Sequence, residues 1–240
     1  MIKKITASIL IAASFLFFSV TKSIAADLSD LTFTVGLTGG AGLYAADGEE
    51  RENNGGGTTQ DVNPHKAYME IGTAALFGEV TLMDRITLGV EYMPGGVETD
   101  ISTDEKQDCQ RGHINTSTCY NAADLGNVGI NTVSAEFDNF RKIYVDVMIA
   151  GGMYVKGGFA EMDLNTKEDL RSGTTYGNTT MQGQIIGIGH RSTPVEGWIV
   201  KTEAIYENWD KVTLTDSNGV NQVSAKVDGI QARLSIGKSF

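Results

Sequence analysis

The chain has 240 residues, with 19 Lys and Arg against 30 Asp and Glu, and a formal net charge of −11 at pH 7. Nucleic acids attract basic protein surfaces, so this acidic balance argues against a nucleic acid as partner. The length suffices for one domain.

The first 25 residues have the order of a secretory signal peptide. Lys3 and Lys4 precede an apolar stretch over residues 5–20, and Ser23-Ile24-Ala25 offers a small-x-small cleavage site. The apolar stretch is shorter than the roughly 20 residues of a spanning helix. We therefore predict a signal peptide over residues 1–25 and one exported domain over residues 26–240.

The exported part contains segments in which apolar and polar residues alternate, the pattern of a strand with one apolar and one polar face. The clearest is the fourth, where Val133 and Val145 share one parity while Lys142 and Tyr144 share the other. In the second, the phase slips near Gly78, which predicts a bulge. The eight predicted strands cover about residues 31–45, 66–83, 85–103, 131–149, 153–166, 180–191, 197–214 and 230–240.

Short and long connections alternate strictly along the chain. The short ones are Asp84 with its neighbours, Ala150-Gly151-Gly152, and Ser192 to Glu196. An up-and-down barrel places all connections of one kind at one end, as in outer-membrane barrels with short periplasmic turns and longer outer loops. The predicted outer loops cover about residues 46–65, 104–130, 167–179 and 215–222.

The C-terminal segment completes the pattern, because Ile230, Leu234, Ile236 and Phe240 fall on one face. An export signal followed by a terminal strand that ends in an aromatic residue resembles bacterial outer-membrane β-barrels, specifically the small eight-stranded barrels of the OmpA, OmpX and OmpW type. The resemblance implies an all-β fold, an eight-stranded antiparallel up-and-down transmembrane β-barrel, in the cell outer membrane. It also implies that the assembly machinery reads Phe240 as a signal. Lys238 departs from the apolar or aromatic residue usual in that family.

The face that points into the barrel is predicted from charge. A small barrel of eight strands is filled by its own side chains, and opposite charges can pair there. Aromatic residues on the apolar face near strand ends suit interfacial belts: Phe33, Tyr92, Trp198, Tyr206 and Phe240. The predicted lumen charges are Glu70, Glu91, Glu136, Asp138, Lys142, Asp146, Lys201, Glu203, Glu207 and Arg233.

The two cysteines, Cys109 and Cys119, fall in one predicted loop. Oxidising compartments favour disulfides, so we expect a local bridge between them. A zinc site is disfavoured, since His113 is the only nearby histidine. We expect neither a metal nor another cofactor.

One constellation suggests catalysis. His190 and Ser192 form a His-x-Ser, and Glu203 follows on the next strand, which resembles the constellation of outer-membrane lipid A 3-O-deacylases. Thr193 departs from the Asn of that family, and Ser192 falls at a predicted periplasmic turn. A surface turn that contains His and Ser by accident is far commoner, so we expect no enzyme.

Three functions remain in order of preference. The first is a structural or surface-exposed barrel whose loops bind partners, and the second is a narrow passive channel for small or hydrophobic solutes. The third is a lipid A-modifying enzyme. The expected partners are outer-membrane lipid, lipopolysaccharide and the assembly machinery, and a monomer is expected.

Overall fold

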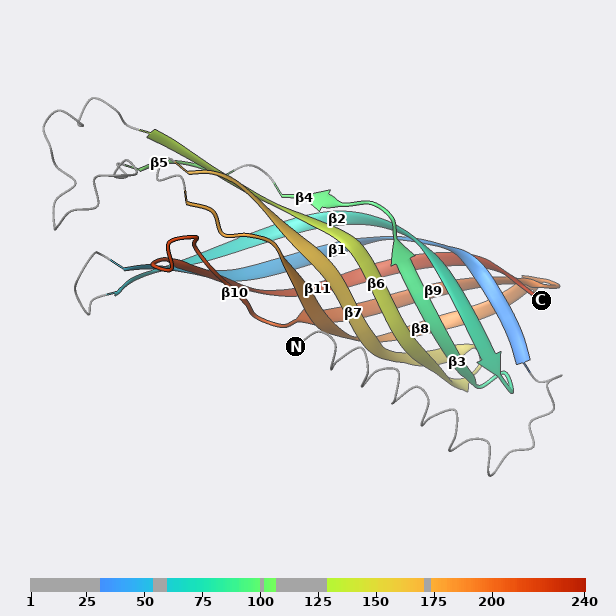
Figure 1. The fold of residues 1–240 in the computed structure, drawn as a ribbon. Coiled ribbons are helices and arrows are strands. Elements are labelled where there is room, and N and C mark those ends of the chain that lie inside the picture. Colours follow the sequence, from blue (N-terminus) through green and yellow to red (C-terminus); the bar gives the residue numbers. More distant parts are fainter. Residues whose placement is uncertain (1–30, 54–59, 100–101, 107–128, 171–173) are drawn as a thin grey trace, which may run out of the picture.

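The structure, a computed structural model, describes residues 31–53, 60–99, 102–106, 129–170 and 174–240 (Figure 1). The predicted signal peptide over residues 1–25 lies outside the described residues. So do Cys109 and Cys119, and their disulfide stays a prediction.

Every regular element of the described residues is a β-strand. Within them no helix is long and apolar enough to cross a membrane. The strands are β1 (Leu31–Asn53), β2 (Gln60–Leu82), β3 (Ile86–Met93), β4 (Val97–Glu98), β5 (Ser102–Lys106), β6 (Gly129–Ala150), β7 (Met153–Asp169), β8 (Thr179–Val195), β9 (Trp198–Trp209), β10 (Val212–Thr215) and β11 (Gln222–Ser239).

The strands form a closed ring in chain order. β4 and β5 continue the line of β3 along β6, and β10 continues β9 along β11, so the ring has 8 antiparallel positions. The ring closes because β1 pairs with β11 from Thr34↔Ser239 to Arg51↔Gln222. Closure gives every strand of the ring a partner on both sides. The predicted eight-stranded up-and-down antiparallel barrel is therefore confirmed.

Three tight turns lie at one end of the barrel, beside the C-terminal residue (Figure 1). Residues 83–85 join β2 to β3, and Gly151-Gly152 joins β6 to β7. The third turn was predicted at Ser192 to Glu196, but β8 continues to Val195 and the turn is Glu196-Gly197. Gly197 takes a φ of +71°, which a glycine adopts without strain.

The other end is longer than predicted. Residues 46–65 were predicted as a loop, yet β1 and β2 stay paired to Asn53↔Gln60. The polar composition misled the prediction, because a ladder exposed to water on both faces needs no apolar residues. The turn at 216–221 matches the predicted loop 215–222 closely.

The name stem is used for the part of the barrel in which the strands form a closed ring. The strand residues beyond it form the extension, which is residues 46–53, 60–75, 97–98, 102–106, 129–138, 163–169 and 212–227.

The predicted bulge at Gly78 is absent, since the register of β2 runs unbroken past it on both sides. Phe77 points inward, where Gly36 and Gly237 leave room for its ring. An aromatic residue on the inner face had been misread as a change of phase. A bulge does occur in β6 between Asp138 and Arg141, where Asn139 has a φ of +51°.

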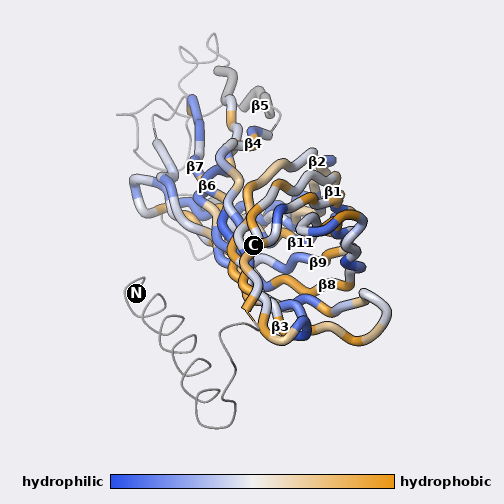
Figure 2. The backbone as a smooth tube through the Cα atoms, turned by 90° about the vertical axis from the view of Figure 1, so that its right-hand side faces the viewer, coloured by the Kyte–Doolittle hydropathy of each residue, from blue (hydrophilic) through white to orange (hydrophobic). Residues whose placement is uncertain are grey.

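The outer surface of the stem is apolar and its interior mixed. Strand residues alternate between exposed and buried, and Figure 2 shows the matching alternation of hydropathy along the strands. Near the turns the interior is charged. Toward the extension it becomes an apolar cluster of Tyr144, Ala160, Met162, Leu164, Met181, Ile185, Ile205 and Trp209.

Candidate functional site

The barrel interior is the first candidate site, because ionisable side chains are buried there. Five carboxylates and four cations are almost fully buried in the stem, a nearly balanced set. Those predicted from the sequence are Glu91, Lys142, Asp146, Lys201, Glu203, Glu207 and Arg233. The structure adds Glu79 and Lys156.

Three predicted lumen charges lie on the outer wall, which corrects the sequence analysis. Glu70 pairs with Leu43, whose side chain is exposed, so Glu70 also points outward. Glu136 and Asp138 lie beyond the bulge in β6, where the extra residue exchanges the two faces of the strand. Phe137 between them packs against the inner apolar cluster.

The two added charges had signals that were misread. Glu79 points inward like Phe77 and alternates with the apolar Val80 and Leu82, but it was not included among the predicted lumen charges. Lys156 precedes two glycines, which left the phase of its strand ambiguous. A basic residue across from Asp146 in the β6–β7 register would have indicated its place.

Lys201 is the centre of the network nearest the turns. Its ammonium donates to Glu79 and, at 2.9 Å, to Asp146. Lys156 contacts Asp146 at 3.3 Å and Glu203 at 2.8 Å. Both ammonium groups are nearly inaccessible to water, so each depends on these carboxylates for compensation of its charge.

A second set of pairs continues the network toward the extension. Lys142 contacts Glu207 at 2.5 Å and Glu91 at 3.8 Å. Arg233 pairs with Glu91 and lies 3.7 Å from Glu203. Through Glu91 and Glu203 the pairs join into one connected network, with residues from six strands: β2, β3, β6, β7, β9 and β11.

Three buried tyrosines, Tyr44, Tyr144 and Tyr154, are also part of the network, because each of them donates its hydroxyl to a buried carboxylate. The rings fit because an inward glycine on a neighbouring strand leaves space: a Cβ at Gly89 would overlap the Tyr144 ring, and one at Gly189 the Tyr154 ring. The bonds are Tyr44 to Glu207 at 3.0 Å, Tyr144 to Glu79 at 2.8 Å and Tyr154 to Glu203 at 2.7 Å.

The apolar cluster fills the barrel interior between the charged network and the extension. Trp209 has no accessible surface, and Phe140 packs against it edge to face with ring centroids 5.0 Å apart. Glu207, below it, is also fully buried. A water-filled pore would leave its lining side chains accessible to water. Because Trp209 and Glu207 are inaccessible, side chains fill the interior at this level.

The outer wall of the stem carries aromatic residues at two levels. Trp198 and Phe240 lie at the turn end, and Tyr92 and Tyr206 lie toward the extension; all are exposed. Tyr206 donates its hydroxyl to Asp228 at 2.8 Å, so its polar tip points away from the apolar band. Trp198 and Tyr206 are eight residues apart on β9, about 27 Å along a strand and roughly 20 Å after tilt. This spacing matches an apolar band about 25 Å tall.

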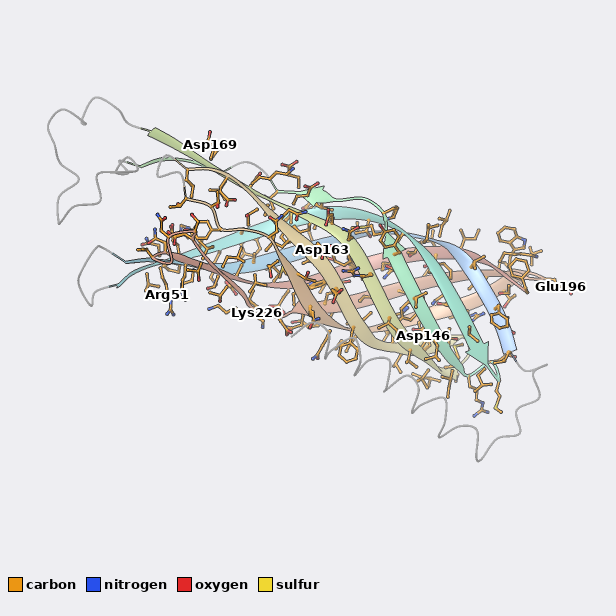
Figure 3. All side chains as sticks on the ribbon, viewed as in Figure 1. Arg51, Asp146, Asp163, Asp169, Glu196 and Lys226 are labelled. Atoms are coloured by element: carbon orange, nitrogen blue, oxygen red, sulfur yellow. The ribbon has the colours of Figure 1, made fainter. Side chains whose placement is uncertain are left out.

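The extension carries exposed ion pairs, beside exposed apolar side chains such as Val62 and Tyr68. Lys167 contacts Glu98 at 3.1 Å and Glu136 at 3.2 Å. These hydrogen bonds, the one from Glu98 first, raise the pKa of the Lys167 ammonium above its ordinary value. Arg141 contacts Glu161 at 2.8 Å where the stem meets the extension. In Figure 3, Arg51, Asp169 and Lys226 lie at the end opposite Glu196.

The catalytic constellation is not assembled. His190 is exposed on the outer face of β8, whereas Glu203 points into the lumen from β9, bound to Lys156 and Tyr154. Ser192 hydrogen-bonds the backbone of Val200 at 3.4 Å. Among the described residues, moreover, no group of three His, Cys, Asp or Glu could hold a metal ion.

Comparisons with known proteins place the chain beside outer-membrane barrels of low sequence identity. No family model matches the chain, and no curated protein matches it. The outer membrane protein OprG from Pseudomonas aeruginosa has a TM-score of 0.46 at 13% identity, covering 87% of this chain and 95% of that one.

Two further solved structures are similar. The outer membrane protease OmpT from Escherichia coli has a TM-score of 0.43 at 11% identity, over 91% of this chain and 98% of that one. The attachment invasion locus protein Ail of Yersinia pestis, in complex with the heparin analogue sucrose octasulfate, has a TM-score of 0.37 at 10% identity, over 85% and 99%. The barrel itself rests on the strand pairing described above.

Proposed function

We propose that this protein is a structural, surface-exposed barrel of the bacterial outer membrane. Its closed stem spans the lipid, and its polar extension stands in the external medium as a surface for binding partners. The observation that carries the proposal is the length of the strands beyond the apolar band.

The lengths can be compared directly. β1 and β2 each have 23 residues, about 75 Å along the strand and roughly 55–60 Å after tilt. An apolar band of about 25 Å accounts for less than half of that length. A barrel that only had to span the membrane would need strands of about 9–11 residues.

The filled interior supports this role over that of a passive channel. Glu207 and Trp209 are inaccessible to water at two successive levels of the stem. A solute moving through the lumen would have to break buried ion pairs and displace an indole ring. The separation of His190 from Glu203 likewise supports a binding role over lipid A modification.

The proposed partners follow from the same geometry. Lipid surrounds the apolar band, lipopolysaccharide lies against the start of the extension, and the monomer is closed by its own β1–β11 seam. The assembly machinery reads the last strand through Phe240, whose side chain is 75% exposed on the outer wall.

Deleting Phe240 tests the assembly proposal. The deletion removes two backbone hydrogen bonds with Phe33, of 2.8 and 3.3 Å, at the end of the seam. We expect less protein in the outer membrane of cells, while the purified chain still folds in detergent. Unchanged assembly in cells would contradict the role of Phe240.

The proposed topology is tested with an epitope inserted into one of two turns. An epitope within residues 216–220, at the end of the extension, should bind antibody on intact cells. The same epitope between Gly151 and Gly152 is the matched control, and it should bind only after the outer membrane is permeabilised. Equal binding at both sites on intact cells would overturn the proposed topology.

A further inference from the structure

Lys238 is a cation on the apolar outer wall of the stem. It follows Leu234 and Ile236 on the outward face of β11, and both of those side chains are at least half exposed. Its neighbours across the two strand pairings are Val35 and Trp198, also outward and apolar. Both cross-strand neighbours of Lys238 are therefore apolar.

The position of the ammonium group is nevertheless well defined. The Lys238 Nζ lies 5.5 Å from the centroid of the Trp198 ring. It also occupies the space that a side chain at Gly197 would fill, since a Cβ there would lie 2.6 Å from Nζ. The amide of Ser239 donates to the Gly197 carbonyl at 2.8 Å, which ties the end of β11 to this turn. Strand and turn thus hold the cation at the rim of the barrel.

The charge of Lys238 has no partner within the described part of the chain. The ion pairs of these residues include Arg233 and Lys226 on the same strand, but none includes Lys238. A cation on the lipid face is strongly unfavourable at the midplane of the bilayer but is tolerated near the interface. Its location beside Trp198 and Phe240 is the interfacial level.

We propose that Lys238 and Trp198 form a binding site for the phosphate of an anionic phospholipid in the leaflet at the turn end. The ammonium pairs with the phosphate while the indole packs against the glycerol and upper acyl chain. Because Gly197 has no side chain, the ammonium fits against the turn at this rim. This site accounts for Lys238, which breaks the apolar pattern of the last strand, and it rests on the proposed membrane location.

The test uses the full exported chain refolded into vesicles of phosphatidylcholine with increasing phosphatidylglycerol. Incorporation is measured first, by protection of the stem from protease. The midpoint of urea unfolding is then followed against the phosphatidylglycerol fraction, and native mass spectrometry measures lipid retention. We expect phosphatidylglycerol to raise the midpoint, and Lys238→Met to lower phosphatidylglycerol retention about fivefold, the rough worth of one cation near an anionic surface.

Three controls make the result specific. Lys238→Arg keeps the charge and should retain the lipid, and Lys66→Met, on the exposed extension, should behave as the unmodified chain. Inorganic phosphate in place of chloride, at equal ionic strength, should not reproduce the effect, which distinguishes the lipid from free phosphate.

Two results would overturn the inference. If both chains incorporate, and the urea midpoint and lipid retention depend equally on phosphatidylglycerol in Lys238→Met and in the unmodified chain, the proposed lipid site is wrong. The proposed membrane role is then unaffected. Failure of the unmodified chain to incorporate removes the proposed membrane role and the lipid site with it.

Discussion

The stem and the extension belong to the same strands, yet they solve the problem of backbone hydrogen bonding differently. In the stem each strand pairs on both sides. In the extension, β1 is the one partner of β2 from Ala75 to Gln60 within the part of the chain that the structure describes, because the pairing of β2 with β3 ends at Leu76↔Tyr92. Lipid offers unpaired amides no partner, whereas water does. The ring of strands is therefore closed where the outer surface is apolar, and strand pairing is incomplete where the outer surface is in contact with water.

The unpaired edge of β2 carries residues that are suited to contact with water. Pro64 lacks a backbone donor, and Lys66 places a charge on the strand, where it pairs with Asp47 at 3.4 Å. Proline and lysine are typical of edge strands that avoid pairing with other chains. The stem has no such need, since its edges are joined.

The largest expected effect comes from breaking the buried network of the stem. Lys201→Met leaves Glu79 and Asp146 buried without their main cation. We expect a loss of about 3–5 kcal/mol in the free energy of unfolding, measured by urea titration in vesicles. Lys167→Met removes the ion pairs of an exposed lysine in the extension and should shift the midpoint far less. Equal losses would mean that the two regions do not differ in their exposure to water.

A single outward arginine should distinguish the two regions next. Val90 and Val62 are exposed to similar extents, 57% and 49%, but Val90 lies on the stem and Val62 on the extension. Val90→Arg should cost about 2–4 kcal/mol if it lies near the midplane of the bilayer. Val62→Arg should change the free energy of folding into vesicles very little. A larger cost for Val62→Arg than for Val90→Arg would mean that lipid surrounds the extension and not the stem.

The smallest expected effect concerns the titration of Lys167. Its hydrogen bonds to Glu98 and Glu136 raise the pKa of the ammonium. A raised pKa in the folded state means that the contribution to stability is present at neutral pH. It is lost only as pH rises through the raised value. NMR titration should show Lys167 titrating above the ordinary lysine range, and Glu98→Gln should lower its pKa. A Lys167 that titrates in the ordinary range in both chains would show that the contacts are not maintained in solution.

The sequence predicted the barrel well because alternation and turn spacing are local properties. It correctly assigned the opposing faces of β6 at Lys142 and Val145, where nothing interrupts the strand. It failed at Glu136 and Asp138, because one extra residue at Asn139 exchanges the faces, and a bulge has no strong signal of its own. The extension was missed because β1 beyond Ala46 has the composition of a loop.

The interior was only partly predictable for a related reason. Whether Phe77 or Val80 points inward depends on the space left by Gly36 and Gly237, which lie on other strands. The partners of each charge depend on contacts between residues far apart in sequence, such as Lys142 with Glu207. No periodicity within one strand contains that information.

The filled stem is the central claim, and conductance across a planar bilayer tests it most directly. The full exported chain, folded and inserted, should show no steps of current above the bare membrane at either polarity, because the ion-pair network and Trp209 occupy the lumen. Insertion is verified in the same preparation by protease protection of the stem. A steady, reproducible single-channel conductance from the inserted protein would contradict the account.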